Sequence, residues 1–266
     1  MQIVDFHCHI YPDAIAQKAT RSIEQFYELD GGGMDGTVSR LLEQGAKAGI
    51  SHYVVLPVGL KPNHVRHINE FIVEQVAAHK EFTGFGTVHA GMEQVEAEVE
   101  FIHNSGLRGV KMHPDTQLFH IDDPRLYPAY DLMRQKGLFV MLHMGDSRYN
   151  YSHPARLRRV MDQFPGLKVV AAHFGGYSVY EEAKEILSDT DCFMDVSSSL
   201  MFMDRETAVR YIRHYGTERL VYGSDYPLWD PEVEVKRFLS LDLTDAEVEQ
   251  ITYKTAAGML GFDEND

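Results

Sequence analysis

Eight short apolar runs recur along the chain and alternate with longer segments whose apolar residues repeat at helical spacing. The runs, typical of buried strands, cover residues 3–6, 52–56, 82–88, 107–112, 138–142, 168–172, 192–196 and 219–222. Helical patterns cover residues 63–79, 92–104, 124–135, 154–163, 177–187 and 204–214. A last helix is predicted over 244–260, because Thr244 and Glu247 have the spacing of a capping box.

Strands that alternate with helices pair in parallel through helical crossovers. Eight such strands fit a closed barrel or an open doubly wound sheet, and the strand count favours the barrel. We therefore predict an α/β fold, a (β/α)8 TIM barrel with a C-terminal helix, formed by residues 1–266 as a single domain. Residues 30–36 contain four glycines and are expected to form a loop, either a lid over the barrel mouth or an ordinary surface loop.

The composition narrows the classes of function. A net charge of −15 and a pI near 5.3 argue against nucleic acid or an anionic membrane as a partner. Cys8 and Cys192 are too few for a disulfide framework. No secretory leader is visible, and no run reaches the ~18 apolar residues of a membrane span. We expect a cytoplasmic protein that acts on a small molecule, with loop lengths compatible with a monomer or a homodimer.

The chemistry lies at the ends of the predicted strands. The first run ends in His7-Cys8-His9, and strand alternation points both imidazoles to the same side. Cys8 then points the other way and is expected to be a core residue. Two imidazoles side by side at a strand end form half of a metal site.

Further histidines, a lysine and an aspartate stand at the ends of later predicted strands. Lys111 and His113 end the fourth strand, His143 the fifth, His173 the sixth and Asp225 the eighth. Active sites of barrel enzymes lie at this carboxyl-terminal face. Three histidines and one aspartate suit a divalent ion such as Zn²⁺, with Mn²⁺ as the alternative. The sequence therefore predicts a metal site built from several strand ends.

This order of residues resembles that of the amidohydrolase superfamily of metal-dependent barrel enzymes. Three segments, Val110-Lys111-Met112-His113-Pro114, Ala172-His173-Phe174-Gly175-Gly176 and Gly223-Ser224-Asp225-Tyr226-Pro227, are similar to its amidohydrolase-related branch. That branch includes uncharacterised hydrolases and the aminocarboxymuconate-semialdehyde decarboxylase type. The resemblance covers essentially the whole chain, and it is specific for the superfamily rather than for a substrate.

The resemblance implies roles for individual residues. His7, His9, His143 and Asp225 would bind one metal ion. Asp225 would also accept a proton from the attacking water. His173 would orient that water, act as a general base or stabilise the developing oxyanion.

Two roles are open for Lys111, and two for His113. In binuclear members a carboxylated lysine on the fourth strand bridges two metals, and His143 and His173 would then hold the second ion. Otherwise Lys111 pairs with a substrate carboxylate or with Asp225, and we favour this interpretation with a single metal. His113 would line the pocket or fix the loop before Pro114.

Candidate substrate contacts follow the fifth and eighth strands. Arg148 could pair with a substrate carboxylate, and Tyr149 could stack on the substrate or donate a hydrogen bond. Trp229 could form a wall of the pocket or pack the last loop against the barrel. Residues 197–199, three serines at the end of the seventh strand, could hydrogen-bond the substrate or cap a helix, and we favour the helix cap.

Two enzymatic functions follow from this site. The first is a hydrolase in which a metal-activated water attacks the carbonyl of an amide, cyclic amide, lactone or ester in a small, acidic molecule. The alternative is a non-oxidative, metal-dependent decarboxylase of a small carboxylic acid. A barrel that binds metal without catalysis is a third hypothesis, and fold alone does not separate the three.

Overall fold

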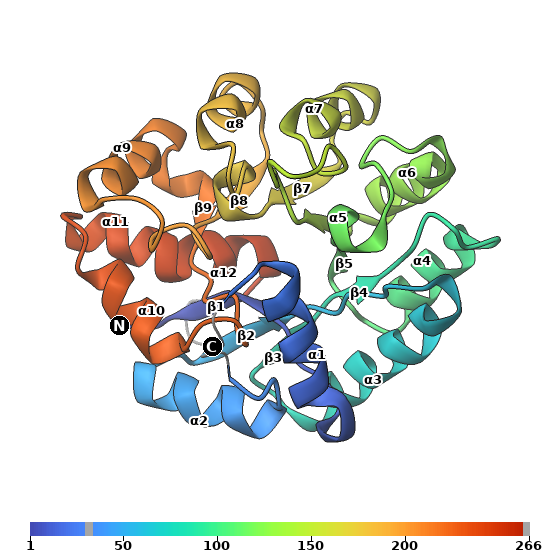
Figure 1. Cartoon of the computed structure of the whole chain (residues 1–266), viewed down its shortest axis with the longest axis horizontal. Coiled ribbons are helices and arrows are strands. Elements are labelled where there is room, and N and C mark those ends of the chain that lie inside the picture. Colours follow the sequence, from blue (N-terminus) through green and yellow to red (C-terminus); the bar gives the residue numbers. More distant parts are fainter. Residues whose placement is uncertain (30–33, 263–266) are drawn as a thin grey trace. The chain divides into compact units, whose positions relative to one another are not determined.

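The computed structural model describes residues 1–29 and 34–262, so residues 30–33 of the expected loop lie outside the described part. The chain forms two compact units, one of Met1–Val55 with Val196–Asp266 and one of Leu56–Asp195. In each unit short strands alternate with helices, which confirms the predicted α/β class (Figure 1). No helix in the described ranges has the length and apolar character needed to cross a membrane.

The second unit, Leu56–Asp195, is built on parallel strands. Its strands are β3 (Phe82–Gly84), β4 (Gly86–Thr87), β5 (Gly109–Met112), β6 (Phe139–Leu142), β7 (Lys168–Ala171) and β8 (Phe193–Asp195). Strands β4 to β8 are neighbours in sequence order and pair in parallel. Its helices are α3 (Val65–Ala78), α4 (Val95–Asn104), α5 (Pro114–Gln117), α6 (Tyr127–Lys136), α7 (Pro154–Gln163) and α8 (Tyr180–Leu187), with single turns η1 (Pro62–His64), η2 (Pro124–Leu126) and η3 (His173–Gly175). Helices α6, α7 and α8 lie along one side of these strands (Figure 1).

The register of β5, β6 and β7 positions the histidines that follow these strands. Met112 pairs with Leu142, which in turn pairs with Ala171. The ladder continues past β6, because the amide of His143 donates to the carbonyl of Met112 at 3.0 Å. The three histidines that follow these parallel strands therefore leave the sheet at the same edge.

The predicted strand over 82–88 is two strands, interrupted at Phe85. Glycines flank the interruption and allow close packing of the helices. A Cβ at Gly84 would lie 2.7 Å from the side chain of Val76 in α3, and one at Gly86 would lie 2.5 Å from that of Ile102 in α4. Glycine in a strand often marks such a close approach or a bend, which the apolar pattern does not reveal.

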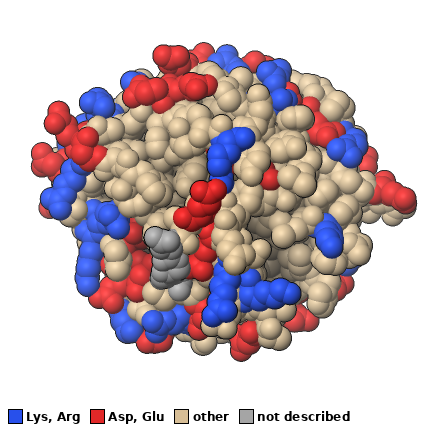
Figure 2. All heavy atoms as spheres, viewed as in Figure 1, with Lys and Arg blue, Asp and Glu red and all other residues tan. Residues whose placement is uncertain are grey.

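The first unit contains both ends of the chain. Its strands are β1 (Val4–Cys8), β2 (His52–Val55) and β9 (Leu220–Val221). Its helices are α1 (Asp13–Phe26), α2 (Val38–Ala48), α9 (Arg205–Tyr215), α10 (Pro231–Leu239), α11 (Asp245–Glu249) and α12 (Thr255–Leu260), with a 3₁₀ turn η4 (Thr217–Arg219) and a π turn η5 (Gln250–Lys254). Strand β1 pairs in parallel with β2, and α2 packs against α10. On the face drawn in Figure 2, acidic and basic side chains are interspersed.

Backbone hydrogen bonds hold the segment after β9 alongside β1. The amide of Phe6 donates to the carbonyl of Tyr222 at 2.9 Å, and the amide of His9 donates to that of Tyr226 at 2.7 Å. The predicted last helix keeps its capping box at Thr244 but is interrupted by η5. The carbonyl of Ile251 in that widened turn accepts the amide hydrogen of Tyr222 at 2.9 Å. The π turn thus provides a hydrogen-bond acceptor for the residue that follows β9.

Candidate metal centre

In the first unit, His7 and His9 lie on the same side of the chain at the end of β1. Their Nε2 atoms are 3.2 Å apart. Oδ1 of Asp225 lies 3.4 Å from Nε2 of His7 and 3.7 Å from Nε2 of His9. The amide of Asp225 donates to the carbonyl of His7 at 2.9 Å, which places the two residues next to each other. The structure therefore brings together three of the predicted site residues.

These three separations fit one divalent ion. Metal–ligand bonds of about 2.1 Å in tetrahedral geometry place neighbouring ligand atoms about 3.4 Å apart. Two imidazole nitrogens and a carboxylate oxygen are donors that suit Zn²⁺, and Mn²⁺ accepts the same set. His7 is 1% exposed and Asp225 is 5% exposed, so the donor atoms are shielded from bulk water.

Neighbouring side chains contact the remaining polar atoms of His7 and Asp225. The hydroxyl of Ser197 lies 3.1 Å from Nδ1 of His7. The hydroxyl of Ser198 donates to Oδ2 of Asp225, and the indole N–H of Trp229 donates to Oγ of Ser198 at 2.8 Å. Ser198 and Asp225 both adopt positive φ angles, of 45° and 60°, which non-glycine residues rarely adopt. The contact between their side chains links these two strained positions.

The expectation that the three serines cap a helix is wrong. Helix α9 begins at Arg205, and its N-cap is Asp204, whose side chain accepts the amide hydrogen of Thr207 at 2.8 Å. The local sequence gave no sign of the serines' true partners, because Ser197 is 190 residues from His7.

Asp5 is a buried carboxylate that sequence reasoning missed. One oxygen, Oδ1, accepts the amide hydrogens of His7 at 3.2 Å and of Ser224 at 2.9 Å. Asp5 thus ties the backbone of β1 to the residue before Asp225. Burial raises the pKa of Asp5 to about 6. Burial also raises the pKa of the Cys8 thiol, and the neighbouring Asp5 adds to that rise, so Cys8 is an inert core residue as predicted.

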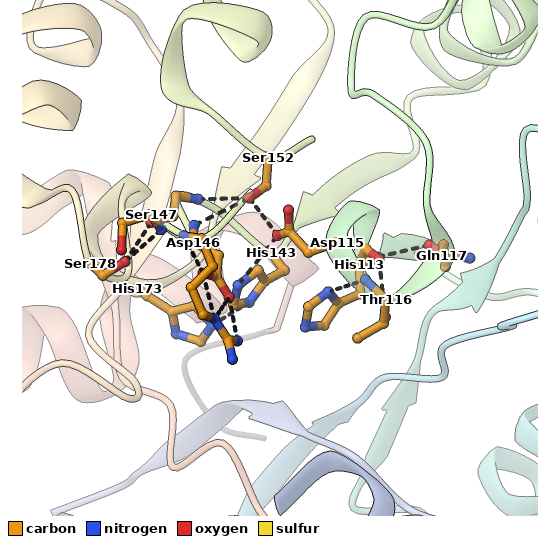
Figure 3. A network of polar contacts seen from close by, with 12 residues as sticks. His113, Asp115, Thr116, Gln117, His143, Asp146, Ser147, Ser152, His173 and Ser178 are labelled. Carbon is orange, nitrogen blue, oxygen red and sulfur yellow. Dashed lines mark hydrogen bonds and ion pairs between the residues drawn. The ribbon is translucent and has the colours of Figure 1, made fainter. Parts of the chain in front are cut away.

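In the second unit, His143 and His173 face each other (Figure 3). Nδ1 of His143 lies 3.1 Å from Nε2 of His173. The other ring nitrogens face buried carboxylates, with His143 Nε2 3.8 Å from Oδ2 of Asp115 and His173 Nδ1 3.8 Å from Oδ1 of Asp195. Asp195 also accepts the backbone amide hydrogen of His173 at 3.1 Å. An imidazole supported by a carboxylate is the usual arrangement of a metal ligand or a general base.

His113 stacks on His143 with a ring-centroid distance of 3.9 Å and an angle of 7° between the planes. His113, Asp115 and His143 lie close enough to suggest a metal group of their own. Parallel stacked rings direct their in-plane lone pairs along parallel lines, however, so one ion cannot meet both lone pairs well. His113 therefore packs beside His143, and its Nδ1 accepts the amide hydrogen of Thr116 at 3.4 Å, which fits the predicted role of fixing the loop at Pro114.

Arg148 is engaged by a residue of its own loop. Its guanidinium forms a two-pronged ion pair with Asp146, with Nη2–Oδ2 at 2.7 Å and Nε–Oδ1 at 3.0 Å. Its Cζ lies 5.4 Å from the ring centre of Tyr149, which is 40% exposed. Lys111 is buried in β5. A substrate contact by Arg148 or Tyr149 stays a prediction, and so does a bridging role for Lys111.

The comparison with sequence families gave one match over almost the whole chain. A profile of the family described as Amidohydrolase matches residues 4–262. No curated protein matches the chain at a significant level.

Solved structures of similar fold cover nearly all of the chain. An uncharacterized TIM-barrel protein from Bordetella bronchiseptica has a TM-score of 0.83 and 20% identity, covering 98% of this chain and 99% of that one. A dihydroxybenzoic acid decarboxylase from Polaromonas sp. JS666, with bound manganese and the inhibitor 2-nitroresorcinol, has a TM-score of 0.74 and 14% identity, covering 98% and 97%. A candidate 2-pyrone-4,6-dicarboxylic acid hydrolase from Pseudomonas putida has a TM-score of 0.69 and 19% identity, covering 98% of both chains. This likeness confirms the predicted TIM-barrel fold.

Proposed function

Because the chain belongs to the amidohydrolase family, and is thus an enzyme of the hydrolase or carboxy-lyase type, we propose that it is a metal-dependent hydrolase of small carbonyl compounds. We also propose that residues 1–266 act as one catalytic domain with one divalent ion. The observation that best supports this proposal is the spacing of three donor atoms. His7 Nε2, His9 Nε2 and Asp225 Oδ1 lie 3.2 to 3.7 Å from one another, which fits the ligands of a single ion.

His143 is proposed as the fourth protein ligand. Support comes from its position directly after β6 and from the role that the resemblance to the amidohydrolase superfamily implies for it. Zn²⁺ suits this mixed nitrogen and oxygen set, and the manganese in the Polaromonas decarboxylase supports Mn²⁺ as the alternative. When bound, the ion supplies Lewis-acid activation of a water molecule and of the substrate carbonyl.

Asp225 is proposed as a metal ligand and His173 as the general base. Ser198 donates to Oδ2 of Asp225, which leaves Oδ1 directed at the imidazoles. His173 takes the proton of the attacking water as general base, because the nearby Asp195 carboxylate stabilises the imidazolium that forms.

The pairing of Arg148 favours hydrolysis of a neutral carbonyl group. A decarboxylase has to hold the carboxylate of its substrate, and a guanidinium is well suited to that task. Asp146 already engages this guanidinium through both of its carboxylate oxygens. Arg148 therefore gives no support for an acidic substrate, which leaves Lys111 as the candidate partner of a substrate carboxylate.

A decarboxylase is the second candidate, favoured by the likeness to the manganese-containing dihydroxybenzoic acid decarboxylase. In that case His173 would assist proton transfer to the carbon atom that loses CO₂. Hydrolysis and decarboxylation differ in which atoms of the organic product come from water.

Isotope labelling separates the two candidates. Metal-loaded protein is incubated with small lactones, cyclic amides, esters and hydroxybenzoates, in parallel, in ¹⁸O-water and in ²H₂O. Hydrolysis places ¹⁸O in the new carboxylate of the organic product, and His173→Asn should strongly slow this labelling while the metal stays bound. Release of CO₂ with a new C–²H bond, and no ¹⁸O in the organic product, would contradict the hydrolase and establish the carboxy-lyase.

A further inference from the structure

Asp115 lies beside the imidazole of His143 (Figure 3). It comes from α5, the short helix after β5, and is completely buried. Its Oδ2 atom is 3.8 Å from Nε2 of His143, on the ring nitrogen opposite the one that faces His173. A buried carboxylate at this place is costly unless neighbouring groups hold it.

Ser152 holds Asp115 in place. Its hydroxyl donates to Oδ2 of Asp115 at 2.5 Å. The same oxygen of Ser152 accepts the amide hydrogens of Gly145 at 3.0 Å and of Asp146 at 3.4 Å. Because Gly145 follows His143 by two residues, the serine connects the carboxylate to the backbone just after that histidine. The orientation of Asp115 is therefore set by contacts independent of His143.

The placement of Asp115 fits a supporting carboxylate better than a ligand. Oδ2 accepts the hydroxyl hydrogen of Ser152 and is the oxygen that faces His143, whereas Oδ1 accepts no hydrogen bond in the described part of the chain. The stacking of His113 on His143 disfavours a common ion for the three side chains. A ligand role for Asp115 would require a second ion in each chain, and counting bound ions tests this.

We propose that Asp115, held by Ser152, is a positioning residue that keeps the proton of His143 on Nε2 and leaves Nδ1 as the metal-binding nitrogen. This inference rests on the proposed function, in which His143 is a ligand. Metal-bound histidines generally donate their other N–H to such a partner, and losing the partner typically lowers metal affinity about 10- to 100-fold.

Metal affinity of four proteins tests the proposal. Full-length wild type, Asp115→Asn, Ser152→Ala and the control Asp122→Asn are loaded with Co²⁺, and the dissociation constant is measured by competition with a chelator. Asp122 is a suitable control because it is a carboxylate of the same unit whose partners are Arg156 and Arg159. We expect Asp115→Asn to weaken binding about 10- to 100-fold, with Ser152→Ala weakening it less and the control unchanged. The visible spectrum of the bound Co²⁺ should also change in the Asp115 variant.

Two further measurements keep the test decisive. The ¹⁵N shifts of the His143 ring in metal-free wild type report its tautomer without any variant, and the tautomer with the proton on Nδ1 would overturn the proposal. A folded Asp115→Asn protein that binds Co²⁺ as tightly as wild type would also overturn it, as would a fall from two bound ions to one. His143→Ala tests the underlying function separately, because retention of the metal there would remove His143 from the ligand set.

Discussion

Gly223 lies against His7, and its replacement by alanine should disturb the metal centre without removing any ligand. A Cβ at position 223 would lie 2.7 Å from Cβ of His7 and 3.3 Å from Cβ of Ser197. Carbon atoms do not approach that closely without displacement, and β1 is held by its parallel partner and by Asp5. His7 therefore has to move relative to Asp225.

Gly223→Ala should lower the free energy of unfolding by about 1–3 kcal/mol, the usual cost of overpacking a filled core. Gly258→Ala is the matched control, since no atom lies within 4 Å of a Cβ there and the residue is inside helix α12. That control should raise the stability by up to about 1 kcal/mol, because alanine restricts the unfolded chain and favours the helix.

Urea denaturation of the metal-free proteins measures both changes, and chelator competition measures the affinity for the ion. Gly223→Ala should be less stable and bind metal more weakly, whereas Gly258→Ala should bind metal as wild type does. Equal stability and equal affinity of Gly223→Ala and wild type would refute the close packing of Gly223 on His7.

Three other outcomes are expected. Chelation of the metal-loaded protein should lower its melting temperature, because an ion at 100 times its Kd stabilises the fold by about 2.7 kcal/mol; calorimetry with no shift would count against the site. Ser198→Ala removes the partner of the Trp229 indole and of Asp225 Oδ2, so denaturation should show a loss of about 1–3 kcal/mol; an unchanged midpoint would show that these contacts do not stabilise the fold. Burial raises the pKa of Asp5 from 3.8 to about 6, so the folded state holds this proton more tightly than the unfolded chain. Stability of the metal-free protein should therefore fall, by up to about 3 kcal/mol, as the pH rises through that interval. Asp5→Asn should flatten this slope in pH-dependent denaturation, and an identical slope would contradict the assignment.

The sequence was sufficient to predict the strand-end residues because two regular features govern them. The period of two placed His7 and His9 on one side, and their Nε2 atoms lie 3.2 Å apart. Parallel pairing placed His143 and His173 at one edge, 3.1 Å apart through their ring nitrogens. Both features depend on local pattern and topology, which the sequence displays.

The side chains that support those residues depend on distant contacts. The partner of Ser197 was not predicted and Asp115 was missed, because the residues that these side chains contact lie in other strands and loops, where no periodicity connects them. The partner of Arg148 could have been recognised, since Asp146 is two residues away and also accepts its amide hydrogen at 2.9 Å. An aspartate whose side chain accepts the amide hydrogen of the second residue after it forms a known turn.

The helices also show which sequence signals were used and which were overlooked. Helix α1 was not predicted, although Ile15, Ala19 and Ile23 recur at helical spacing along it. Helix α10 was not predicted either, although Asp230 as N-cap and Pro231 in the first turn are start signals. The Thr244 capping box was predicted and is confirmed, because both of its hydrogen bonds are present.

The metal content of the purified chain tests the central claim most directly. Elemental analysis after loading with Zn²⁺ or Mn²⁺, followed by removal of loosely bound ions, gives the number of ions in each chain. We predict one ion in the wild type and close to none in His9→Ala and in Asp225→Ala, with both variants still folded by circular dichroism. An unchanged metal content in both variants would contradict the proposed centre, and two ions in the wild type would replace it with a binuclear site.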